Sequence, residues 1–341
     1  MSWTACEAAD QAGVALRGVQ KSDAERGCRD ERIECVDKNE AVEERVAQGE
    51  VDLVAGTVWL WARDAMQGSV DVLVVDEAGQ MSLANALAAS GAAQSLVLLG
   101  DPRQLEQPQK GVHPPGTDAA ALEHLVGPDT LAPDRGLFLD ETWRLHPDVC
   151  AFTSELYYEG KLRSRLELAG QRVDGPDPFD GAGLRLWPVE HQGNTSESPE
   201  EVRAVAELVE RLLGSGATWV NAEGVRSGIG PGQVLVVTPY NAHVGALRAA
   251  LPAGVPVGTV DKFQGQEAPI VIYSTATSTA QDAPRGMEFL FSPNRTNVAT
   301  SRARCLVVWV GSSRLLGPDC SSVRQMRLAN GFCRLGEMGG G

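Results

Sequence analysis

From about residue 50 onward, short apolar runs, polar loops and helical stretches alternate along the chain. Many of the runs are apolar at consecutive positions, which is typical of strands covered by helices on both faces. The expected strands are "VDLVAGT", "VDVLVVDE", "SLVLLGD", "GLFLDE", "LRLWPV", "QVLVVTPY", "PVGTV", "PIVIYSTA" and "CLVVWVGS". The expected helices span about 82–92, 117–126, 147–158, 198–214, 241–251, 293–303 and 319–330. Strands that alternate with helices predict an α/β fold with mainly parallel sheets.

The remaining segments indicate where the chain divides. The first fifty residues are rich in charge and look helical over "EAADQAGVALRG" and "NEAVEERVAQGE", with Gly49 as a stop for the second helix. The segment "HPPGTDAAALEHLVGPDTLAPDRG" is rich in Pro, Gly and Asp around one short helix, and it predicts a joint between two domains. The loose stretch "AGQRVDGPDPFDGAG" is interpreted as a surface excursion of the second domain.

Composition narrows the class of protein. Acidic residues outnumber basic ones 45 to 30, giving a net charge of -15, which argues against a protein that coats nucleic acid by bulk electrostatics. A motor that holds a strand with backbone amides, hydroxyls and a few local cations remains compatible with this charge. The seven cysteines show no CxxC spacing, so free, reduced thiols are expected. No apolar run is long enough for a membrane span and no signal peptide is visible, so the sequence predicts a cytoplasmic protein without a membrane partner.

Polar side chains follow two of the expected strands. Asp76 and Glu77 end "VDVLVVDE", while Asp101 and Gln104 follow "LVLLG". Ligands of open parallel sheets bind at the carboxyl ends of the strands. An Asp that holds Mg²⁺, a Glu that activates water and a Gln that senses the γ-phosphate suit nucleotide hydrolysis. The alternative is a pair of solvated carboxylates at loop starts.

The motifs around these residues resemble those of a known family. "VVDEAGQ" and "LLGDPRQL" resemble motifs II and III of superfamily 1 helicases, more specifically of the up-frameshift type. Further similar motifs follow in the family's order, over about residues 50–315: "LDETWRLHPDVCAFTSELYYEGKL", "VLVVTPYNAHV", "VGTVDKFQGQEAPIVIYSTA" and "NVATSRAR". The resemblance implies two RecA-like parallel-sheet domains, the first incomplete, over 1–137 and 138–330, with a tail at 331–341.

The resemblance also implies roles for individual residues, with ATP and Mg²⁺ as cofactors. Asp76 would hold Mg²⁺, Glu77 would be the base and Gln104 the γ-phosphate sensor, with Asp101 beside them. The remaining nucleotide contacts would come from Trp143 on adenine, Arg144 and Arg302 as arginine fingers, Glu267 on ribose, and Gly265 as a close turn. Thr57, Thr238 and Thr259 would contact single-stranded DNA or RNA.

Each of these roles has a plainer alternative. Trp143 could be a core tryptophan and Arg144 a surface salt bridge, and each threonine could cap a helix or fill a strand. Arg304 is expected to support its helix or an ion pair. The histidines show no ligand spacing.

One motif of such a helicase is missing from the sequence. No GxxxxGK[ST] phosphate loop occurs, because the only Gly-Lys pair is Gly160-Lys161 and Leu162 follows it. The expectation is therefore an N-terminally truncated helicase core, inactive alone, with 5′→3′ polarity implied by the resemblance. The alternatives are a non-catalytic nucleic-acid or protein interaction module, or one half of a split helicase whose loop comes from another chain. "DEAGQMSLANALAAS" also resembles bacterial proteins in which a RecB-type nuclease domain precedes the helicase.

Overall fold

The computed structural model describes residues 2–23, 25, 27–105, 119–127, 135–263 and 265–340. The chain forms two compact units. The first comprises Met1–Pro102 and Glu106–Arg135, and the second comprises Arg103–Leu105 and Gly136–Gly341. The expected site residue Gln104 thus belongs to the second unit, although Asp101 of the same motif belongs to the first.

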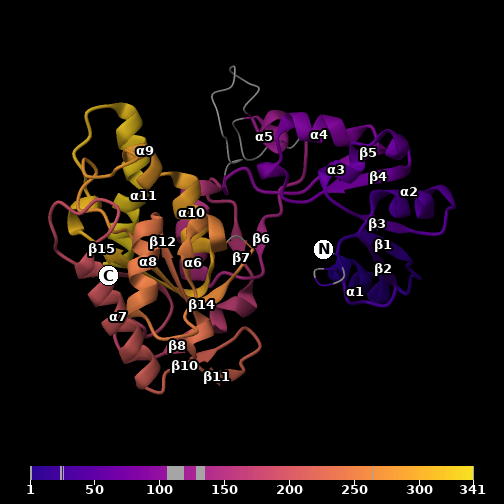
Figure 1. The fold of residues 1–341 in the computed structure, drawn as a ribbon. Helices are drawn as coiled ribbons and strands as arrows, with labels where there is room; N and C mark the ends of the chain where they lie inside the picture. Colours follow the sequence, from indigo (N-terminus) through magenta and orange to yellow (C-terminus); the bar gives the residue numbers. More distant parts are fainter. Residues whose placement is uncertain are drawn as a thin grey trace. The chain divides into compact units, whose positions relative to one another are not determined.

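The second unit is built on a five-stranded sheet in which every pair of neighbouring strands is parallel (Figure 1). In spatial order its strands are β13 Val257–Thr259, β12 Val234–Thr238, β14 Ala268–Ser274, β15 Ala303–Gly311 and β9 Gly183–Pro188. All five coincide with apolar runs that predict strands, and β12 and β14 are buried along their whole length. The expected α/β fold with parallel strands is confirmed.

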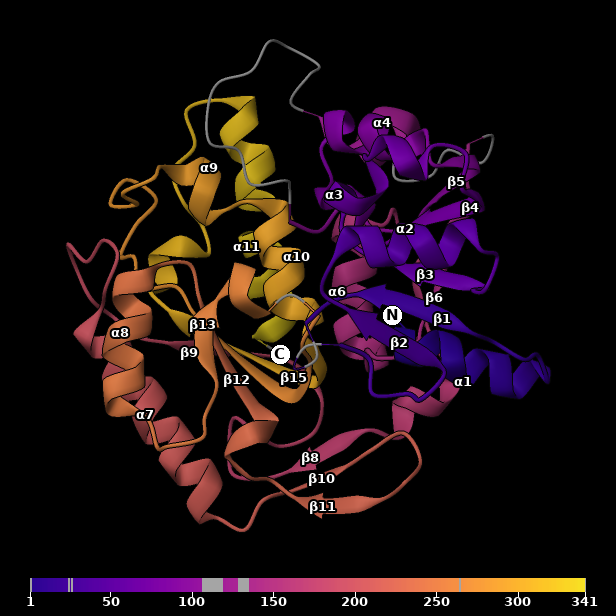
Figure 2. The ribbon, with the colours of Figure 1, turned by 45° about the vertical axis from the view of Figure 1, so that its right-hand side comes forward.

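Helices cover both faces of this sheet (Figure 2). Successive residues of a strand point to opposite faces. In β12, Val234 and Val236 join a core that contains α7 and α8, whereas Leu235 and Val237 join one that contains α6, α10 and α11. The five helices are α6 Pro147–Tyr157, α7 Pro199–Gly214, α8 Asn241–Ala250, α10 Pro293–Ser301 and α11 Val323–Gly339.

Local sequence fixes where these helices begin. Ser198 and Ser292 accept hydrogen bonds from the backbone amides of Glu201 and Arg295, and each is followed by proline in the first turn. A hydroxyl acceptor at the N-cap with proline behind it is a favoured helix start. The helix expected from about residue 293 therefore starts where the sequence predicts it.

Three parts of the second unit differ from expectation. The stretch interpreted as a surface excursion forms β8 Arg172–Asp174 and buries Phe179, and β8 joins β10 Thr218–Val220 and β11 Arg226–Gly228 in an antiparallel sheet. The apolar run "GLFLDE" forms a strand only at its last residue. The strand there, β6, is Glu141–Thr142 and pairs with β7 Arg163–Ser164. The expected tail from 331 is the second half of α11, where Phe332 and Leu335 are fully buried.

The first unit contains two parallel sheets. One has the order β2-β1-β3, and the other pairs β4 with β5. Its elements are α1 Ser2–Ala12, β1 Gly18–Lys21, β2 Ile33–Val36, α2 Asn39–Ala47, β3 Leu53–Ala55, α3 Val58–Trp61, β4 Val70–Val75, α4 Leu83–Ser90, β5 Ala93–Leu98 and α5 Ala121–Val126. The helix expected over "EAADQAGVALRG" ends at Ala12, and β1 begins within the same stretch.

Two expectations from composition can be compared with the structure. All seven cysteines are free, as predicted. Over the described residues, no helix is both long enough and apolar enough to cross a membrane.

Candidate nucleotide and nucleic-acid sites

In the first unit, the expected magnesium and base residues lie at the carboxyl ends of β4 and β5. Asp76 and Glu77 follow β4 directly, and Asp101 follows β5 at the same edge because Val75 is in register with Leu98. Asp76 Oδ1 accepts a hydrogen bond of 3.0 Å from the Glu77 amide. Glu77 has a φ of +54°, a left-handed conformation that is uncommon for a residue with a side chain and is found often at functional sites.

The two loops at this edge approach each other closely. The Ala78 amide donates to the Leu99 carbonyl over 2.8 Å. A Cβ atom at Gly79 would lie 2.8 Å from the Asp101 carbonyl oxygen, and one at Gly100 would lie 2.9 Å from the Ala78 nitrogen. Only glycine fits at both positions, so the sequence "EAG" and "LGD" holds Glu77 and Asp101 on neighbouring loops.

The acidic residues of this edge fit a magnesium ion that is shared with phosphates. Within the described part of the chain, no group of three or more His, Cys, Asp or Glu side chains could hold a metal ion alone. Magnesium in nucleotide sites takes one or two carboxylates and completes its shell with phosphates and water. The exposed carboxylate of Asp76 fits that mode of binding.

In the second unit, two of the expected nucleotide residues, Glu267 and Arg144, lie near the amino ends of β14 and β15. Glu267 immediately precedes β14 and forms an ion pair with Arg144, which also donates to the Ser301 carbonyl over 3.3 Å. Arg304, at the start of β15, has its Nε 3.7 Å from the second Glu267 oxygen. The salt bridge considered for Arg144 and the ion pair expected for Arg304 are therefore both present, and they share one carboxylate.

Arg302 lies in a buried position beside this ion-pair cluster. Its side chain is at the end of α10, with only 2% of the residue exposed, and Nε donates to the Val298 carbonyl. Its Nη2 donates to Gln104 Oε1 over 3.3 Å. The expected γ-phosphate sensor and the expected second finger are thus in direct contact within one unit.

Trp143 is on the surface of this unit. With 72% of the residue exposed, it is not a core tryptophan. The Arg165 guanidinium carbon lies 3.5 Å from the ring centroid, which shows that a planar cationic group already stacks there. Gly265 has a φ of +76°, a conformation that glycine adopts at little cost, in the segment that leads to Glu267.

The three expected nucleic-acid threonines lie at the ends of strands or just after them. Thr238 and Thr259 are in register at the carboxyl ends of β12 and β13, so they lie side by side. Thr259 is half-buried, whereas Thr238 is fully buried and its Oγ1 finds no hydrogen-bond partner among the described residues. Thr57 follows β3, is exposed, and precedes α3 without capping it by its side chain.

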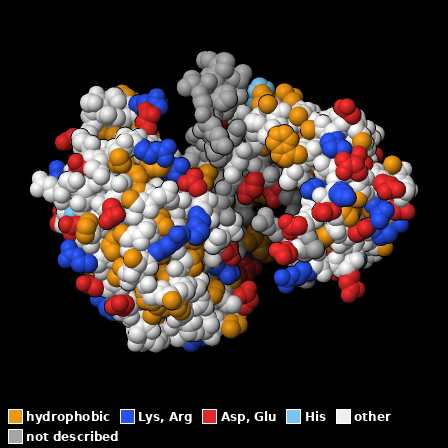
Figure 3. All heavy atoms as spheres, in the orientation of Figure 1, with side chains coloured by type: hydrophobic (Ala, Val, Ile, Leu, Met, Phe, Trp, Pro, Cys, Tyr) orange, Lys and Arg blue, Asp and Glu red, His pale blue; other side chains and the backbone are white. Residues whose placement is uncertain are grey.

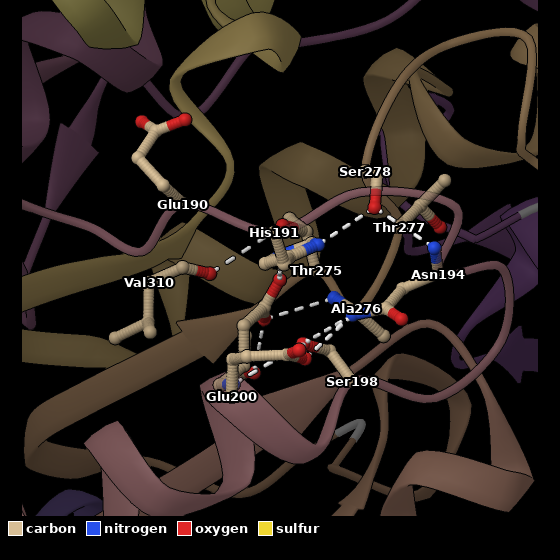
Figure 4. Close-up of polar contacts among 12 residues, drawn as sticks. Glu190, His191, Asn194, Ser198, Glu200, Thr275, Ala276, Thr277, Ser278 and Val310 are labelled. Carbon is tan, nitrogen blue, oxygen red and sulfur yellow. Dashed lines mark hydrogen bonds and ion pairs between the residues drawn. The ribbon is translucent and has the colours of Figure 1, made fainter.

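At the carboxyl edge of the sheet lies a buried polar network that the sequence pattern did not indicate (Figure 4). Its centre is Glu201 in the first turn of α7, with a fully buried side chain. One carboxylate oxygen accepts from Ser274 Oγ (2.6 Å) and the Ala276 amide (2.9 Å), and the other lies 2.9 Å from His191 Nε2. His243 Nε2 is 2.8 Å from the same Ser274 hydroxyl.

The network joins segments in which contacts with nucleic acid are expected. His243 is in α8, two residues after "TPYN", and Ser274 ends β14. Burial lowers the pKa of His243, and the negative charges of Glu201 and Glu197 oppose that shift. A glutamate in the first turn of a helix usually faces solvent, which explains why Glu201 carried no signal in the sequence.

Comparison with known proteins decides the family. The model of a family described as "AAA domain" matches residues 120–314, more than half of the chain. The chain belongs to this AAA domain family. Its relatives are helicases and related proteins, and it has the core of a superfamily 1 helicase of the up-frameshift type. The expected family is confirmed, while a nuclease-linked bacterial origin is not shown.

Individual relatives of this helicase core are much longer proteins. The chain is 27% identical to the "Regulator of nonsense transcripts 1 homolog" of Drosophila melanogaster, over 66% of this chain and 19% of that protein. It is 30% identical to the "DNA-binding protein SMUBP-2" of Mesocricetus auratus, over 72% of this chain and 25% of that protein. A solved arterivirus helicase in complex with DNA is 14% identical with a TM-score of 0.45, over 95% of this chain and 52% of that one. The chain thus spans a quarter or less of the length of these curated relatives.

Proposed function

We propose that this helicase core uses ATP and Mg²⁺ to move along single-stranded DNA or RNA. The observation that carries the proposal is the arrangement at the amino edge of the second unit's sheet. There, Glu267 holds Arg144 and Arg304, and Arg302 contacts Gln104. These residues belong to four of the motifs and to four separate parts of the sequence, so the fold brings them together.

The second unit's residues suit the recognition of ATP. Trp143 offers an exposed ring for the adenine. The Arg165 guanidinium stacked on it shows that the ring can hold a flat group. Arginine binds phosphate oxygens with a planar fork that stays charged at all physiological pH values. In the present structure Arg144 holds a carboxylate, so a phosphate would replace the Glu267 oxygen as its acceptor and leave Glu267 for the ribose.

The first unit's residues suit the hydrolytic step. Mg²⁺ neutralises phosphate charge and is held through carboxylates, a role that Asp76 fits. The Glu77 carboxylate would take the proton from the attacking water, and Gln80 Nε2, 3.2 Å from Glu77 Oε2, orients that carboxylate. The left-handed backbone at Glu77 aims its side chain differently from that of Asp76, which allows the two adjacent carboxylates to serve different partners.

The nucleic acid would be held at the carboxyl edge and not by bulk charge. A net charge of -15 leaves binding to local contacts, and the paired Thr238 and Thr259 together with Thr57 are the proposed phosphate contacts. Exposure of Thr238 would require a small movement of the β12 end, because the residue is fully buried here. Such contacts serve DNA and RNA equally. A cytoplasmic location and a nuclease partner remain proposals.

A second candidate function follows from the sequence. It contains no GxxxxGK[ST], the motif whose amides and lysine hold the β- and γ-phosphates. A nucleotide- and nucleic-acid-binding module without turnover is therefore the alternative, as is a helicase whose phosphate loop is supplied by another chain.

Phosphate release from ATP separates these candidates. The 341-residue chain would be assayed with Mg²⁺ and single-stranded DNA or RNA, and compared with its Glu77→Gln variant. Because the phosphate loop is missing from this sequence, we expect release no higher than in the variant, unless a chain carrying GxxxxGK[ST] is present. Release by the chain alone that Glu77→Gln abolishes would refute the binding-only alternative and establish hydrolysis with these 341 residues.

A further inference from the structure

A cationic and aromatic cluster surrounds the short helix α9 Met287–Leu290 of the second unit. The guanidinium carbons of Arg285 and Arg295 lie 3.8 and 4.3 Å from the centroid of the Phe289 ring. The Tyr240 ring packs on Phe289 with a centroid distance of 5.6 Å. Two guanidinium groups thus share one aromatic side chain, which holds them in place against their mutual repulsion.

The cluster lies at the carboxyl edge of the parallel sheet. Tyr240 comes two residues after Thr238 at the end of β12. Arg295 forms a two-fold ion pair, at 2.9 and 3.3 Å, with Asp261, which comes two residues after Thr259 at the end of β13. Ligands of open parallel sheets bind outside this edge. The cluster is therefore joined to both threonines that are proposed to contact nucleic acid in this unit.

Arg285 differs from its neighbour in the cluster. Arg295 is only 19% exposed in its side chain and is neutralised by Asp261, whereas Arg285 is exposed and has no ion-pair partner among the described residues. Figure 3 shows Lys and Arg side chains among hydrophobic ones on the face over α8, α9 and α10. In a protein with a net charge of -15, an unneutralised guanidinium fixed on an aromatic ring is a local site for an anion.

We infer that Arg285, held in place by Phe289, contacts the phosphodiester backbone of single-stranded nucleic acid at this edge. The inference rests on the proposed function, because it adds a contact to the same nucleic-acid path. A guanidinium donates to two phosphate oxygens at once, and a flat cation over an aromatic ring can also stack against a base. The contact reads no sequence, which suits a motor that moves along any strand.

The test is a binding titration with the full chain. A fluorescein-labelled single-stranded 20-mer of dT or rU would be titrated by anisotropy at several NaCl concentrations, for wild type, Arg285→Ala, Arg285→Lys and Arg211→Ala. Arg211 is the matched control, because its guanidinium carbon lies 5.3 Å from the Trp187 ring of β9, the border strand opposite β13. All three substitutions are at exposed side chains, so folding should be preserved.

We expect Arg285→Ala to weaken binding about tenfold at low salt, the loss of one charge-assisted hydrogen bond. The slope of log affinity against log salt should fall by about 0.7, the share of one phosphate contact on a single strand. Arg285→Lys should keep the slope, and Arg211→Ala should behave as wild type. Equal binding and slope for Arg285→Ala and Arg211→Ala would overturn the inference and leave the proposed function standing. No binding by the wild type would overturn both.

Discussion

Glu201 is an acidic side chain placed where burial of a charge is most costly. Both of its carboxylate oxygens are occupied by donors from other parts of the chain, namely His191, Ser274 and the Ala276 amide. A buried polar group is tolerated when its hydrogen bonds are satisfied, and its partners lose theirs if it is changed. This carboxylate therefore fixes the loop after β14 against the start of α7.

Replacing Glu201 with glutamine tests this role. If the NH₂ group replaces the oxygen that accepts from Ser274 and the Ala276 amide, those buried donors lose their acceptor, and if it faces His191, the imidazole must change its tautomer. We expect the free energy of unfolding to fall by about 2 kcal/mol, measured by urea denaturation. The control is Glu207→Gln on the same helix, where the side chain is exposed and the change should cost little. Equal stability of both variants would contradict the assigned role of the network.

At the scale of elements, the proposed catalytic edge of the first unit depends on two loops that touch. The loop after β4 passes so close to the loop after β5 that Gly79 and Gly100 meet backbone atoms of the opposite loop. Backbone atoms cannot move aside as the end of a flexible side chain can. The positions of Glu77 and Asp101 are therefore coupled through glycine contacts.

Gly79→Ala should disturb this coupling. The added Cβ would lie 2.8 Å from the Asp101 carbonyl oxygen, and we expect a loss of about 2 kcal/mol in unfolding free energy from overpacking. Gly91→Ala is the control in the same unit, because a Cβ there meets only the amide end of the Gln67 side chain. Thermal or urea unfolding of both variants gives the comparison. A Gly79→Ala protein as stable as the Gly91→Ala protein would show that the loops are not held together in this way.

How much could be predicted from sequence also depends on the element. The core strands β12, β14 and β15 are continuous apolar runs, so their pattern alone predicts them. The strands β1, β2, β8, β10 and β11 have three or four residues each and mix apolar with polar positions, so no periodicity could develop. The run "GLFLDE" is apolar, yet Leu137 and Leu139 are 95% and 80% exposed, which periodicity cannot reveal.

The site residues show the same limit. The motifs identify Arg144 and Glu267, but the ion pair between them spans 123 positions and becomes visible only in the fold. Thr238 and Thr259 were expected as separate contacts, and the register makes them neighbours. The Glu201 network had no local pattern because its partners lie 10 to 75 residues away.

At the scale of the whole molecule, the second unit separates two proposed tasks between opposite edges of one sheet. The arginines and Glu267 lie at the amino ends of β14 and β15, and the threonines and Arg285 cluster lie at the carboxyl ends of β12 and β13. The segment from Thr259 through η5 Val260–Phe263 to Glu267 connects the two edges. This short piece of chain would couple a change at the proposed nucleotide edge to the proposed nucleic-acid edge.

The proposed nucleotide site is tested most directly by the affinity of the 341-residue chain for a fluorescent ATP analogue with Mg²⁺. This affinity would be compared between Trp143→Ala and Trp59→Ala. Trp143 and Trp59 are exposed to a similar extent, 72% and 75%. Only Trp143 lies next to Arg144, which pairs with Glu267. We predict that Trp143→Ala weakens binding about tenfold, since one stacked base contributes roughly 1–3 kcal/mol, and that Trp59→Ala binds as wild type. Unchanged affinity in Trp143→Ala would contradict the adenine site and, with it, the nucleotide edge on which the proposed function depends.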